Sequence, residues 1–366
     1  MKAPRKSRPR QQPSAVDAVI LAVDAFRRGR PVVIRGAGGA ALAFAAETMT
    51  AAALKTLRGR KPPRLVLTHA RARTLKIRLY TSDVAALAVP PDMDVPQLRA
   101  IADPTDDLNY PLKGPFDTVR EDLPQAYAAA VKLAKLAGLL PAALVRTTRA
   151  ATKGAVTLSA AAVFAYDDEI VRTLKIVARA RVPLEGAENT EMVSFRPEDG
   201  GPEHYAIVIN APPTGKPILM RLHSECFTGD LLGSLKCDCG AQLRGAIEAI
   251  AKNGGGILLY LAQEGRGIGL INKLRAYRLQ DQGFDTIDAN ERLGFAADER
   301  QYGLAARMLQ LLGYKSVRLM TNNPDKVAAL KAAGVTVAAR MRHAFPQNEH
   351  NRAYLETKAK RAGHLL

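Results

Sequence analysis

The first half of the chain alternates short apolar runs with amphipathic segments. Apolar residues recur at helical spacing over residues 16–28, 47–58 and 125–137, and the runs at 31–34 and 64–67 predict short buried strands. Residues 104–118 are rich in turn-forming residues, the stretch at 152–165 is apolar with β-branched positions, and a further helix is predicted at 167–175. This alternation favours an α/β or α+β core for the first half.

The pattern changes near residue 180. Short alternating runs over 186–210, broken by the turn sequence at 198–202, predict an antiparallel meander. Strands are then predicted at 217–223, 257–261 and 316–320, and each precedes a predicted helix, at 240–253, 271–282 and 327–333. We therefore expect a second α/β domain with a mixed sheet.

Two turns that follow these strands have the composition of anion-binding sites. The loop at 263–269 is Gly-rich and contains Arg266. The turn at 321–326 contains Thr321 and Lys326, with Asn323 expected as the N-cap and Pro324 at the first helical position. Free N–H groups at a helix start bind phosphate, so both turns are candidate phosphate sites. For the second turn, a well-capped helix with a solvated lysine is the alternative.

The composition is that of a globular protein with no membrane segment. The hydrophobic fraction is 47%, the charged fraction is 24%, and no apolar run approaches the length that spans a bilayer. The basic, Pro-rich residues 1–13 lack the apolar stretch of a signal peptide, so we expect a disordered tail. The net charge of +18 suits nucleic acid or a polyphosphate substrate, but the absence of Trp leaves few platforms for stacking bases. Charge alone does not decide the partner.

All three cysteines lie in one short segment, as Cys226, Cys237 and Cys239. An odd number of clustered thiols without a secretory signal indicates a reducing, cytoplasmic environment and favours metal binding over disulfides. Three thiolates leave the fourth position of a catalytic zinc site open, whereas His223 as a fourth ligand would close a structural site. The polar residues around the cysteines favour the catalytic site; they are Ser224, Glu225, Thr228, Asp230, Ser234, Asp238 and Gln242.

Several motifs of the second half resemble GTP cyclohydrolase II. They are RLHSECFTGD…CDCG, QEGRGIGL, LGFAADER and TNNPDK, and the resemblance covers residues 178–366. It implies hydrolysis of GTP to formate, pyrophosphate and 2,5-diamino-6-ribosylamino-4(3H)-pyrimidinone 5′-phosphate, the first committed step of riboflavin biosynthesis. It also implies one Zn²⁺ per chain, Mg²⁺, and a cytoplasmic homodimer.

The same resemblance assigns roles to individual residues. Cys226, Cys237 and Cys239 correspond to the zinc ligands, Asp298 to a proton acceptor, Arg300 to a nucleophile toward the α-phosphorus, and Tyr277 to a tyrosine beside the imidazole ring. From the residues alone, Asp298 and Arg300 could be an exposed ion pair, and Tyr277 could be a core residue. The residues expected to contact GTP are Arg221, Leu222, His223, Ser224, Glu225, Gln242, Glu264, Gly265, Arg266, Thr286, Thr321 and Lys326.

The first half resembles 3,4-dihydroxy-2-butanone 4-phosphate synthase through GRPVVI…AAETMT, DDLNYP and LAKLAGLLPAALV. The acidic loop of that family is missing after the first strand, and Ala126 and Ala128 stand where His and Glu are expected. Without these carboxylates the domain has no ligands for magnesium and no group that could transfer protons. We therefore expect residues 14–175 to form a degenerate synthase-like domain without chemistry.

The second half departs from its family at Ala262, where arginine is usual, and over residues 340–346. Ala262 motivates one alternative, a paralogue of the cyclohydrolase with an altered product or substrate. The charge of +18 motivates another, a zinc-containing nucleic-acid-binding protein, although basic surfaces bind nucleic acid without specificity. We expect no specific nucleic-acid partner.

Overall fold

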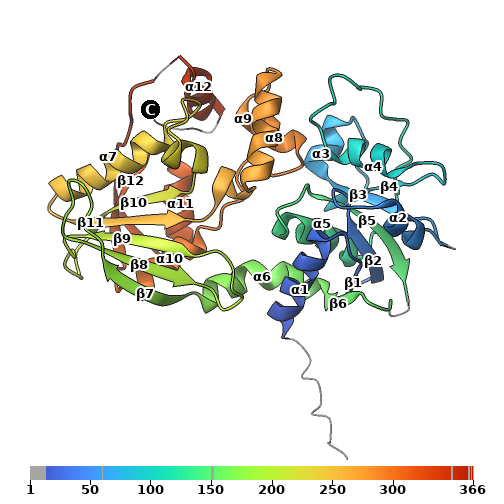
Figure 1. Ribbon diagram of the computed structural model, residues 1–366, viewed down its shortest axis with the longest axis horizontal. Coiled ribbons are helices and arrows are strands. Elements are labelled where there is room, and N and C mark those ends of the chain that lie inside the picture. Colours follow the sequence, from blue (N-terminus) through green and yellow to red (C-terminus); the bar gives the residue numbers. More distant parts are fainter. Residues whose placement is uncertain are drawn as a thin grey trace, which may run out of the picture.

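The computed structural model describes residues 14–59, 61–149, 152–347, 349–361, 363 and 365. Two lobes, each built around its own β-sheet, are joined through helix α6 (Ala160–Thr173), and helices α8 (Leu270–Asp281) and α9 (Thr286–Arg292) lie between them (Figure 1). The tail predicted to be disordered, residues 1–13, lies outside the described residues. We call residues 14–174 the N-terminal half and residues 175–365 the C-terminal half.

The N-terminal half contains a mixed sheet of six strands in the order β4-β3-β5-β2-β1-β6. Neighbouring strands are antiparallel, except that β1 and β6 are parallel. The strands are β1 (Val32–Gly36), β2 (Gly39–Ala45), β3 (Arg64–Thr68), β4 (Val84–Ala88), β5 (Ala142–Thr148) and β6 (Val156–Ser159).

Helices cover both faces of this N-terminal sheet. Val32 and Ile34 pack in one apolar cluster with α1 (Ala15–Arg27), α5 (Gln125–Leu136) and α6. Val33, between them, packs in a second cluster with α2 (Ala51–Leu57), α3 (His69–Thr74) and α4 (Val95–Ala102). Successive side chains of a strand point to opposite faces, so the continuous apolar run in β1 reflects burial on both sides.

The C-terminal half contains a mixed sheet of seven strands in the order β13-β12-β10-β11-β9-β8-β7. The neighbours from β7 to β11 are antiparallel, and β11, β10, β12 and β13 are parallel. The strands are β7 (Lys175–Arg181), β8 (Thr190–Arg196), β9 (His204–Ile209), β10 (Ile218–Ser224), β11 (Gly256–Leu261), β12 (Ser316–Met320) and β13 (Thr336–Met341).

Helices also cover both faces of the C-terminal sheet. Helices α10 (Gly303–Leu311) and α11 (Pro324–Ala332) pack on one face through Met308 and Leu330, and α7 (Cys239–Lys252) packs on the other through Ala246 and Ile250. The short helices η1 (Phe227–Leu231) and η2 (Glu264–Gly267) lie in the loops after β10 and β11, and α12 (Arg352–Arg361) follows β13.

The predicted fold class, two α/β units with mixed sheets, is confirmed. Elements of both halves were missed. The helix expected at 47–58 begins at Ala51, and the helix expected at 167–175 is the end of α6. The elements that were not predicted are β2, β4, β5, α3 and α4 of the N-terminal half and β7, α9, α10, β13 and α12 of the C-terminal half. Within the described residues, no helix is both long enough and apolar enough to cross a membrane.

Candidate active site

One pocket lies at the carboxyl ends of the parallel strands β11, β10 and β12. Loops that leave adjacent parallel strands meet at this edge of a sheet, which is where open α/β folds bind ligands. The predicted residues that line the pocket are Arg221, His223, Ser224, Glu225, Cys226, Cys237, Cys239, Gln242, Glu264, Gly265, Arg266, Tyr277, Thr286, Arg300, Thr321 and Lys326.

Two predicted residues do not line the pocket. Leu222 lies between Arg221 and His223 on β10, so its side chain points to the opposite face and packs in the core. Its carbonyl oxygen accepts a hydrogen bond from Lys326 Nζ at 3.1 Å, which fixes the lysine at the start of α11. Asp298 does not line the pocket, but it accepts a hydrogen bond from Arg300, which does.

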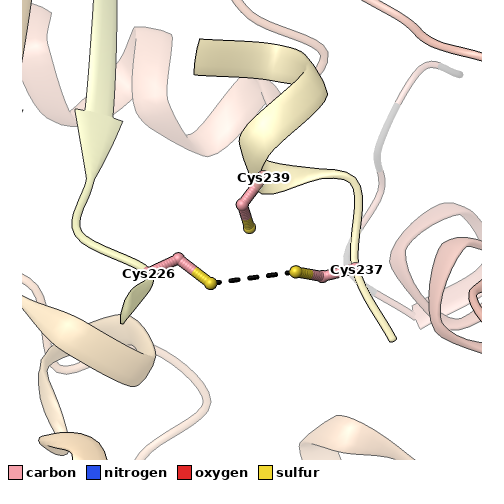
Figure 2. A group of neighbouring side chains, drawn as sticks. All are labelled: Cys226, Cys237 and Cys239. Carbon is pink, nitrogen blue, oxygen red and sulfur yellow. Dashed lines mark hydrogen bonds between the residues drawn. The ribbon is translucent and has the colours of Figure 1, made fainter. Parts of the chain in front are cut away.

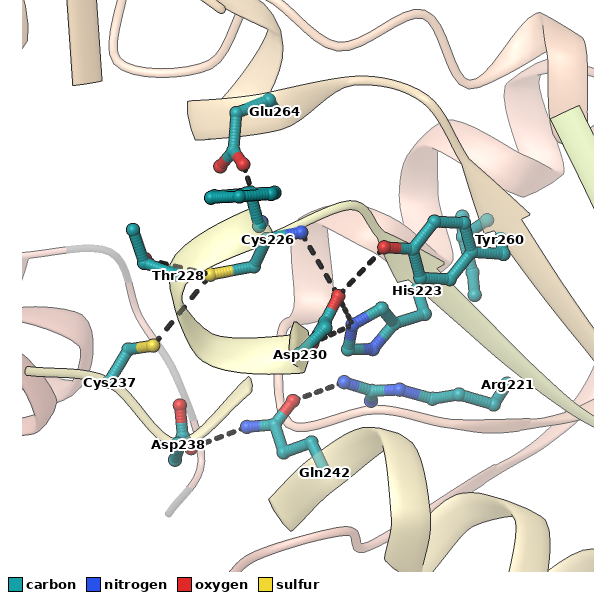
Figure 3. A network of polar contacts seen from close by, with 12 residues as sticks. Arg221, His223, Cys226, Thr228, Asp230, Cys237, Asp238, Gln242, Tyr260 and Glu264 are labelled. Carbon is teal, nitrogen blue, oxygen red and sulfur yellow. Dashed lines mark hydrogen bonds and ion pairs between the residues drawn. The ribbon is translucent and has the colours of Figure 1, made fainter. Parts of the chain in front are cut away.

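The end of β10 is held by a buried polar network centred on Asp230 (Figure 3). The Asp230 carboxylate accepts hydrogen bonds from Cys226 N, Tyr260 Oη and His223 Nε2, each at 3.0 Å. Burial lowers the pKa of His223, although Asp230 opposes the shift, so the imidazole is neutral with its proton on Nε2. His223 Nδ1 is then a buried acceptor, and it has no hydrogen-bond partner among the described residues.

Arg221 carries a buried positive charge on the floor of the pocket. Its guanidinium donates to Gln242 Oε1 (Figure 3). It also donates to the carbonyl oxygen of Met320 on β12 at 2.9 Å. Burial lowers the pKa of Arg221 to about 10, which still leaves it charged near neutral pH. Arg221 Nε is buried without a partner in the described part of the chain. Unpaired buried polar atoms are costly, so Arg221 Nε and His223 Nδ1 indicate a ligand-binding surface.

The three thiols converge at the side of this pocket (Figure 2). Their sulfur atoms all lie within 4.8 Å of one another, and Cys226 Sγ is 3.7 Å from Cys237 Sγ. Two thiolates on one tetrahedral zinc, with Zn–S bonds of about 2.3 Å, would lie about 3.8 Å apart. A Cβ added at Gly229 would come within 2.7 Å of Cys237 Sγ and 3.0 Å of Cys226 Sγ. The space between the sulfurs therefore depends on glycine at this position and fits a metal ion.

The surroundings favour a thiolate at Cys226, whereas the hydrogen bond with Cys226 raises the pKa of Cys237. Hydrogen bonds from the Cys237 and Cys239 thiols, together with Lys273, hold the pKa of Cys226 well below its usual value. Cys239 is the first residue of α7, where the helix dipole also favours a negative charge. His223 does not belong to this group, and its Nε2 is bound to Asp230, so the closed site with His223 as the fourth ligand does not fit the geometry.

Lys273 is a pocket residue that the sequence did not identify. It is only 8% exposed, and its Nζ lies 2.8 Å from Glu264 Oε1 and 3.0 Å from both Cys226 Sγ and Thr228 Oγ1. Glu264 Oε2 accepts a hydrogen bond from Phe227 N at 2.6 Å. The Lys273–Glu264 pair therefore ties α8 to the loop that carries Cys226.

The loop after β11 presents a side chain to the pocket rather than a row of free amides. Gly265 N donates to its neighbour Glu264 Oε1, and Gly267 N and Gly269 N donate to loop carbonyls. These three amides are therefore already paired, and the loop as a phosphate site stays a prediction. Arg266 has a φ of 62°, in the left-handed region that non-glycine residues rarely adopt, and its side chain lines the pocket.

Arg300 and Asp298 form a two-bond ion pair at the rim. Arg300 Nε and Nη2 donate to the Asp298 carboxylate at 2.8 and 2.5 Å, and Tyr302 Oη donates to it at 2.9 Å. Burial alone would raise the pKa of Asp298, but Arg300 and Tyr302 outweigh it and lower the pKa. Asp298 is therefore ionised and paired.

Tyr277 lies on the pocket-facing side of α8. Its hydroxyl is 3.5 Å from Thr228 Oγ1, in the loop between the first two thiols, and Lys273 Nζ and Lys236 Nζ are 5.6 and 5.1 Å from its ring centre. Burial raises the pKa of Tyr277 to about 12, so the phenol keeps its proton near neutral pH. Tyr277 therefore belongs to the pocket lining and is not a core residue.

The remaining wall comes from α9 and from the start of α11. Thr286 Oγ1 accepts a hydrogen bond from Gln280 Nε2 at 3.3 Å. Asn323 caps α11 by accepting from Asp325 N at 2.9 Å, and Pro324 occupies the first turn, as predicted. Pocket residues that the sequence did not identify are Lys236, Ile268, Lys273, Ala276, Gln280, Asn290, Asn322 and Asn323.

The pocket combines a three-thiol centre with a wall of cationic side chains. The cations lining it are Arg221, Lys236, Arg266, Lys273, Arg300 and Lys326. A cationic wall suits a polyphosphate, and a three-thiol centre suits an open zinc site. The fold and the site thus define an α/β protein with a candidate metal centre beside an anion-binding pocket.

Comparison with known proteins identifies the family. The family model of GTP cyclohydrolase II matches residues 175–342. A GTP cyclohydrolase-2 from Azospirillum brasilense is 49% identical over 366 residues, covering 96% of this chain and 95% of its own. Another from Pseudomonas paraeruginosa is 55% identical over 190 residues, covering 52% of this chain and 92% of its own. The chain belongs to the GTP cyclohydrolase II family of enzymes.

Among solved structures, a two-domain 3,4-dihydroxy-2-butanone 4-phosphate synthase from A. baumannii is similar with a TM-score of 0.33 and 16% identity, covering 88% of this chain and 99% of its own.

Proposed function

We propose that the protein hydrolyses GTP to formate, pyrophosphate and 2,5-diamino-6-ribosylamino-4(3H)-pyrimidinone 5′-phosphate, as the first step of riboflavin biosynthesis. The observation that carries this proposal is the junction of three thiols and a cationic wall in a single pocket. The reaction needs hydration of a ring carbon at one end of the substrate and departure of pyrophosphate at the other. The pocket offers a group suited to each step.

The ring end is assigned to the thiol side. Cys226, Cys237 and Cys239 would hold Zn²⁺, which supplies Lewis-acid activation of water for attack on C8 of guanine. Tyr277 keeps its phenolic proton and lies beside the thiols, so it can donate a hydrogen bond to the reacting ring. His223 Nδ1 is a buried acceptor suited to an N–H of the base.

The phosphate end is assigned to the cationic side. Arg266, Arg300 and Lys326 can compensate the negative charge that develops as pyrophosphate departs. Mg²⁺ would arrive on the triphosphate, because this ion usually keeps substrate phosphates and waters among its ligands. Arg300 is held by Asp298 in a planar two-bond pair and remains protonated, so we assign it to binding of the α-phosphate rather than to covalent attack.

The N-terminal half is proposed to have no synthase chemistry. Ala126, where the resembling family has histidine, is fully buried in the core cluster formed with α1 and α6. The resembling family has an acidic loop after its first strand. In this chain the corresponding residues, 35–41, connect β1 to β2 and include no carboxylate. The division into domains at 14–175 and 178–366, the homodimer and the cytoplasmic location rest on the sequence resemblance and remain proposals.

A product assay tests the main proposal. Purified protein supplied with Zn²⁺, Mg²⁺ and GTP should release formate and pyrophosphate in equal amounts. Pyrophosphate without formate would favour the paralogue that stops before deformylation. Salt-sensitive binding to DNA without either product would favour the nucleic-acid-binding alternative. Ala262, the residue that motivated the paralogue hypothesis, does not line the pocket, so its position gives that hypothesis no support.

A further inference from the structure

We propose that the N-terminal half positions the active site, and that Glu47 acts through Arg275 to fix helix α8. This inference rests on the proposed function, because α8 carries Tyr277 and Lys273 into the pocket. Glu47 contacts no pocket residue directly in this arrangement and is therefore a positioning residue.

Helix α8 lies between the two halves of the chain and presents a different face to each (Figure 1). Lys273, Tyr277 and Gln280 line the pocket. Asn272 and Arg275 bond to the N-terminal half instead. Residues three or four apart share one face of a helix, which explains how alternate positions of α8 serve the two sides.

The attachment to the N-terminal half includes a partly buried ion pair, beside a longer contact of Arg275 Nε with Asp103 Oδ2 at 3.5 Å and an exposed Arg278–Asp106 pair. Arg275 Nη2 lies 2.8 Å from Glu47 Oε1, Arg275 Nη1 lies 3.2 Å from Glu47 Oε2, and both side chains are 20% exposed. Glu47 Oε2 also accepts a hydrogen bond from Leu140 N at 2.8 Å, which holds the carboxylate in place. Two-bond arginine–carboxylate pairs fix orientation as well as distance, so this pair sets the rotation of α8 about its axis.

Apolar packing reinforces the ion pair. Leu140, from the N-terminal half, is 2% exposed and packs with Ile268, Ala276 and Leu279. Ala276 and Leu279 do not belong to the clusters that pack on the C-terminal sheet. The N-terminal half thus supplies a substantial part of the surface on which α8 rests.

The loop that carries Arg300 is attached in the same way. Lys135 on α5 lies 2.5 Å from Glu299 Oε1, and Gln301 Nε2 donates to Asp167 Oδ1 on α6 at 2.5 Å. Of the two contact residues, Glu299 lies between Asp298 and Arg300 in sequence and Gln301 directly follows Arg300. Two separate catalytic elements therefore rest on the N-terminal half.

Such contacts matter because catalysis depends on placement. A displacement of about 1 Å of a group in an active site can lower the rate by about 10²-fold. We expect loss of the Glu47–Arg275 pair to lower the rate of formate release by about tenfold, within that limit. The KM for GTP should change less, because the phosphate-binding residues Arg266 and Lys326 do not lie on α8.

The test uses full-length, zinc-supplied Glu47→Ala and Glu47→Gln, with Asp24→Ala as the matched control. Asp24 pairs with Arg28 at 2.8 Å in the same half, on the exposed surface of α1. Hydrogen–deuterium exchange of the amides of α8 and steady-state formate release are measured on each. We expect Glu47→Ala to speed exchange in α8 and lower kcat, Glu47→Gln to do so less, and Asp24→Ala to do neither.

A charge reversal and a double variant separate positioning from general destabilisation. Glu47→Arg combined with Arg275→Glu should recover part of the kcat lost in either single variant. In a Tyr277→Phe background, Glu47→Ala should cost less than in the wild type, because both changes act through the same side chain.

Unchanged exchange in α8, or a kcat loss that only follows the loss of folded protein, would overturn the proposal. Wild-type protein that releases no formate from GTP would refute the proposed function instead, and the exchange measurement would still decide whether Glu47 holds α8.

Discussion

The two halves of the chain build mixed sheets of similar size but bury different side chains. Among the described residues of the N-terminal half, the buried charged and polar side chains are Arg71 and Thr105. Arg71 is fully paired, since it donates to Ile101 O at 2.8 Å and to the Asp107 carboxylate. Among the described residues, buried polar atoms without a partner occur in both halves. Those of the N-terminal half, His69 Nε2 and Arg146 Nε, belong to residues outside the pocket, whereas Arg221 and His223 of the C-terminal half line it.

This difference separates structural from functional burial of polar groups. A buried polar group costs stability unless it is paired, so two unpaired ones that line the same pocket favour a ligand that completes them. The N-terminal core is largely apolar, with large side chains such as Phe26 and Phe44 and with the small residues of α5: Ala126, Ala129, Ala130 and Ala134 are all fully buried. The same type of sheet thus serves as a scaffold in one half and as a binding site in the other.

Among the changes that test this difference between the halves, replacement of a thiol should have the largest effect on activity. Cys237→Ser is expected to abolish formate release while leaving a folded protein, because both halves have cores that do not depend on the metal. Pyrophosphate release and formation of GMP should continue, because the cationic wall is intact. Metal analysis, circular dichroism and the two product assays measure this.

A globally unfolded Cys237→Ser protein would indicate a structural metal site. Equal loss of formate and pyrophosphate in a folded variant would mean that the metal organises the whole pocket, and the division into ring and phosphate sides would be wrong.

The next largest effect should come from the phosphate side. Arg300→Ala is expected to lower release of both products by about 10²-fold or more, since removing one preorganised donor to a developing negative charge costs about that much. Arg179→Ala is the control, because Arg179 pairs with Glu191 at 3.3 Å on the exposed strand β7. Loss of formate alone in Arg300→Ala would contradict the assignment to phosphate.

How far the sequence predicts this site depends on whether the residues form contiguous motifs. The cysteine segment, the Arg266 loop and the Asn323 turn were all placed correctly, because each follows a strand whose apolar run is evident. Lys273 was missed because a lysine within a helix usually lies in solvent, and its burial depends on Glu264 and Cys226 from other elements.

Contacts between the halves leave even less trace in the sequence. Glu47 and Arg275 are separated by 228 positions, and although Glu47 lies in the quoted motif AAETMT, nothing in the sequence indicates that the two side chains meet. The sequence alone predicts that removal of the N-terminal half leaves cyclohydrolase activity, unless that half packs against the dimer. The contacts of α8 with Glu47, Gly138 and Leu140 change that expectation to a loss of activity.

An intermediate effect is expected from crowding the metal centre. Gly229→Ala adds a methyl group that would lie 2.7 Å from Cys237 Sγ, so the thiols must move apart. We expect metal affinity to fall by about 10- to 100-fold, comparable to other changes next to metal ligands. Competition with a chromogenic zinc chelator measures this, and unchanged affinity would show that the thiols can move without cost.

A smaller, selective effect is expected from Tyr277→Phe. Loss of one hydroxyl beside the thiols removes about one hydrogen bond to the reacting ring, so it should lower formate release by about tenfold and leave pyrophosphate release nearly unchanged. The formate-to-pyrophosphate ratio measures the selectivity. A ratio equal to that of the wild type would place Tyr277 outside the ring-opening step.

The last prediction is that the N-terminal half has no synthase activity. The full-length protein is expected to form no dihydroxybutanone phosphate from ribulose 5-phosphate, measured in the same preparation that releases formate from GTP. Restoring a histidine by Ala126→His should not create the activity, because position 126 is fully buried among α1 and α6 side chains and overpacking costs about 1–3 kcal/mol. That variant is expected to melt at a lower temperature instead. Formation of dihydroxybutanone phosphate by the wild-type protein would show that the N-terminal half has retained a reactive site, and the contrast between scaffold and binding site would no longer hold.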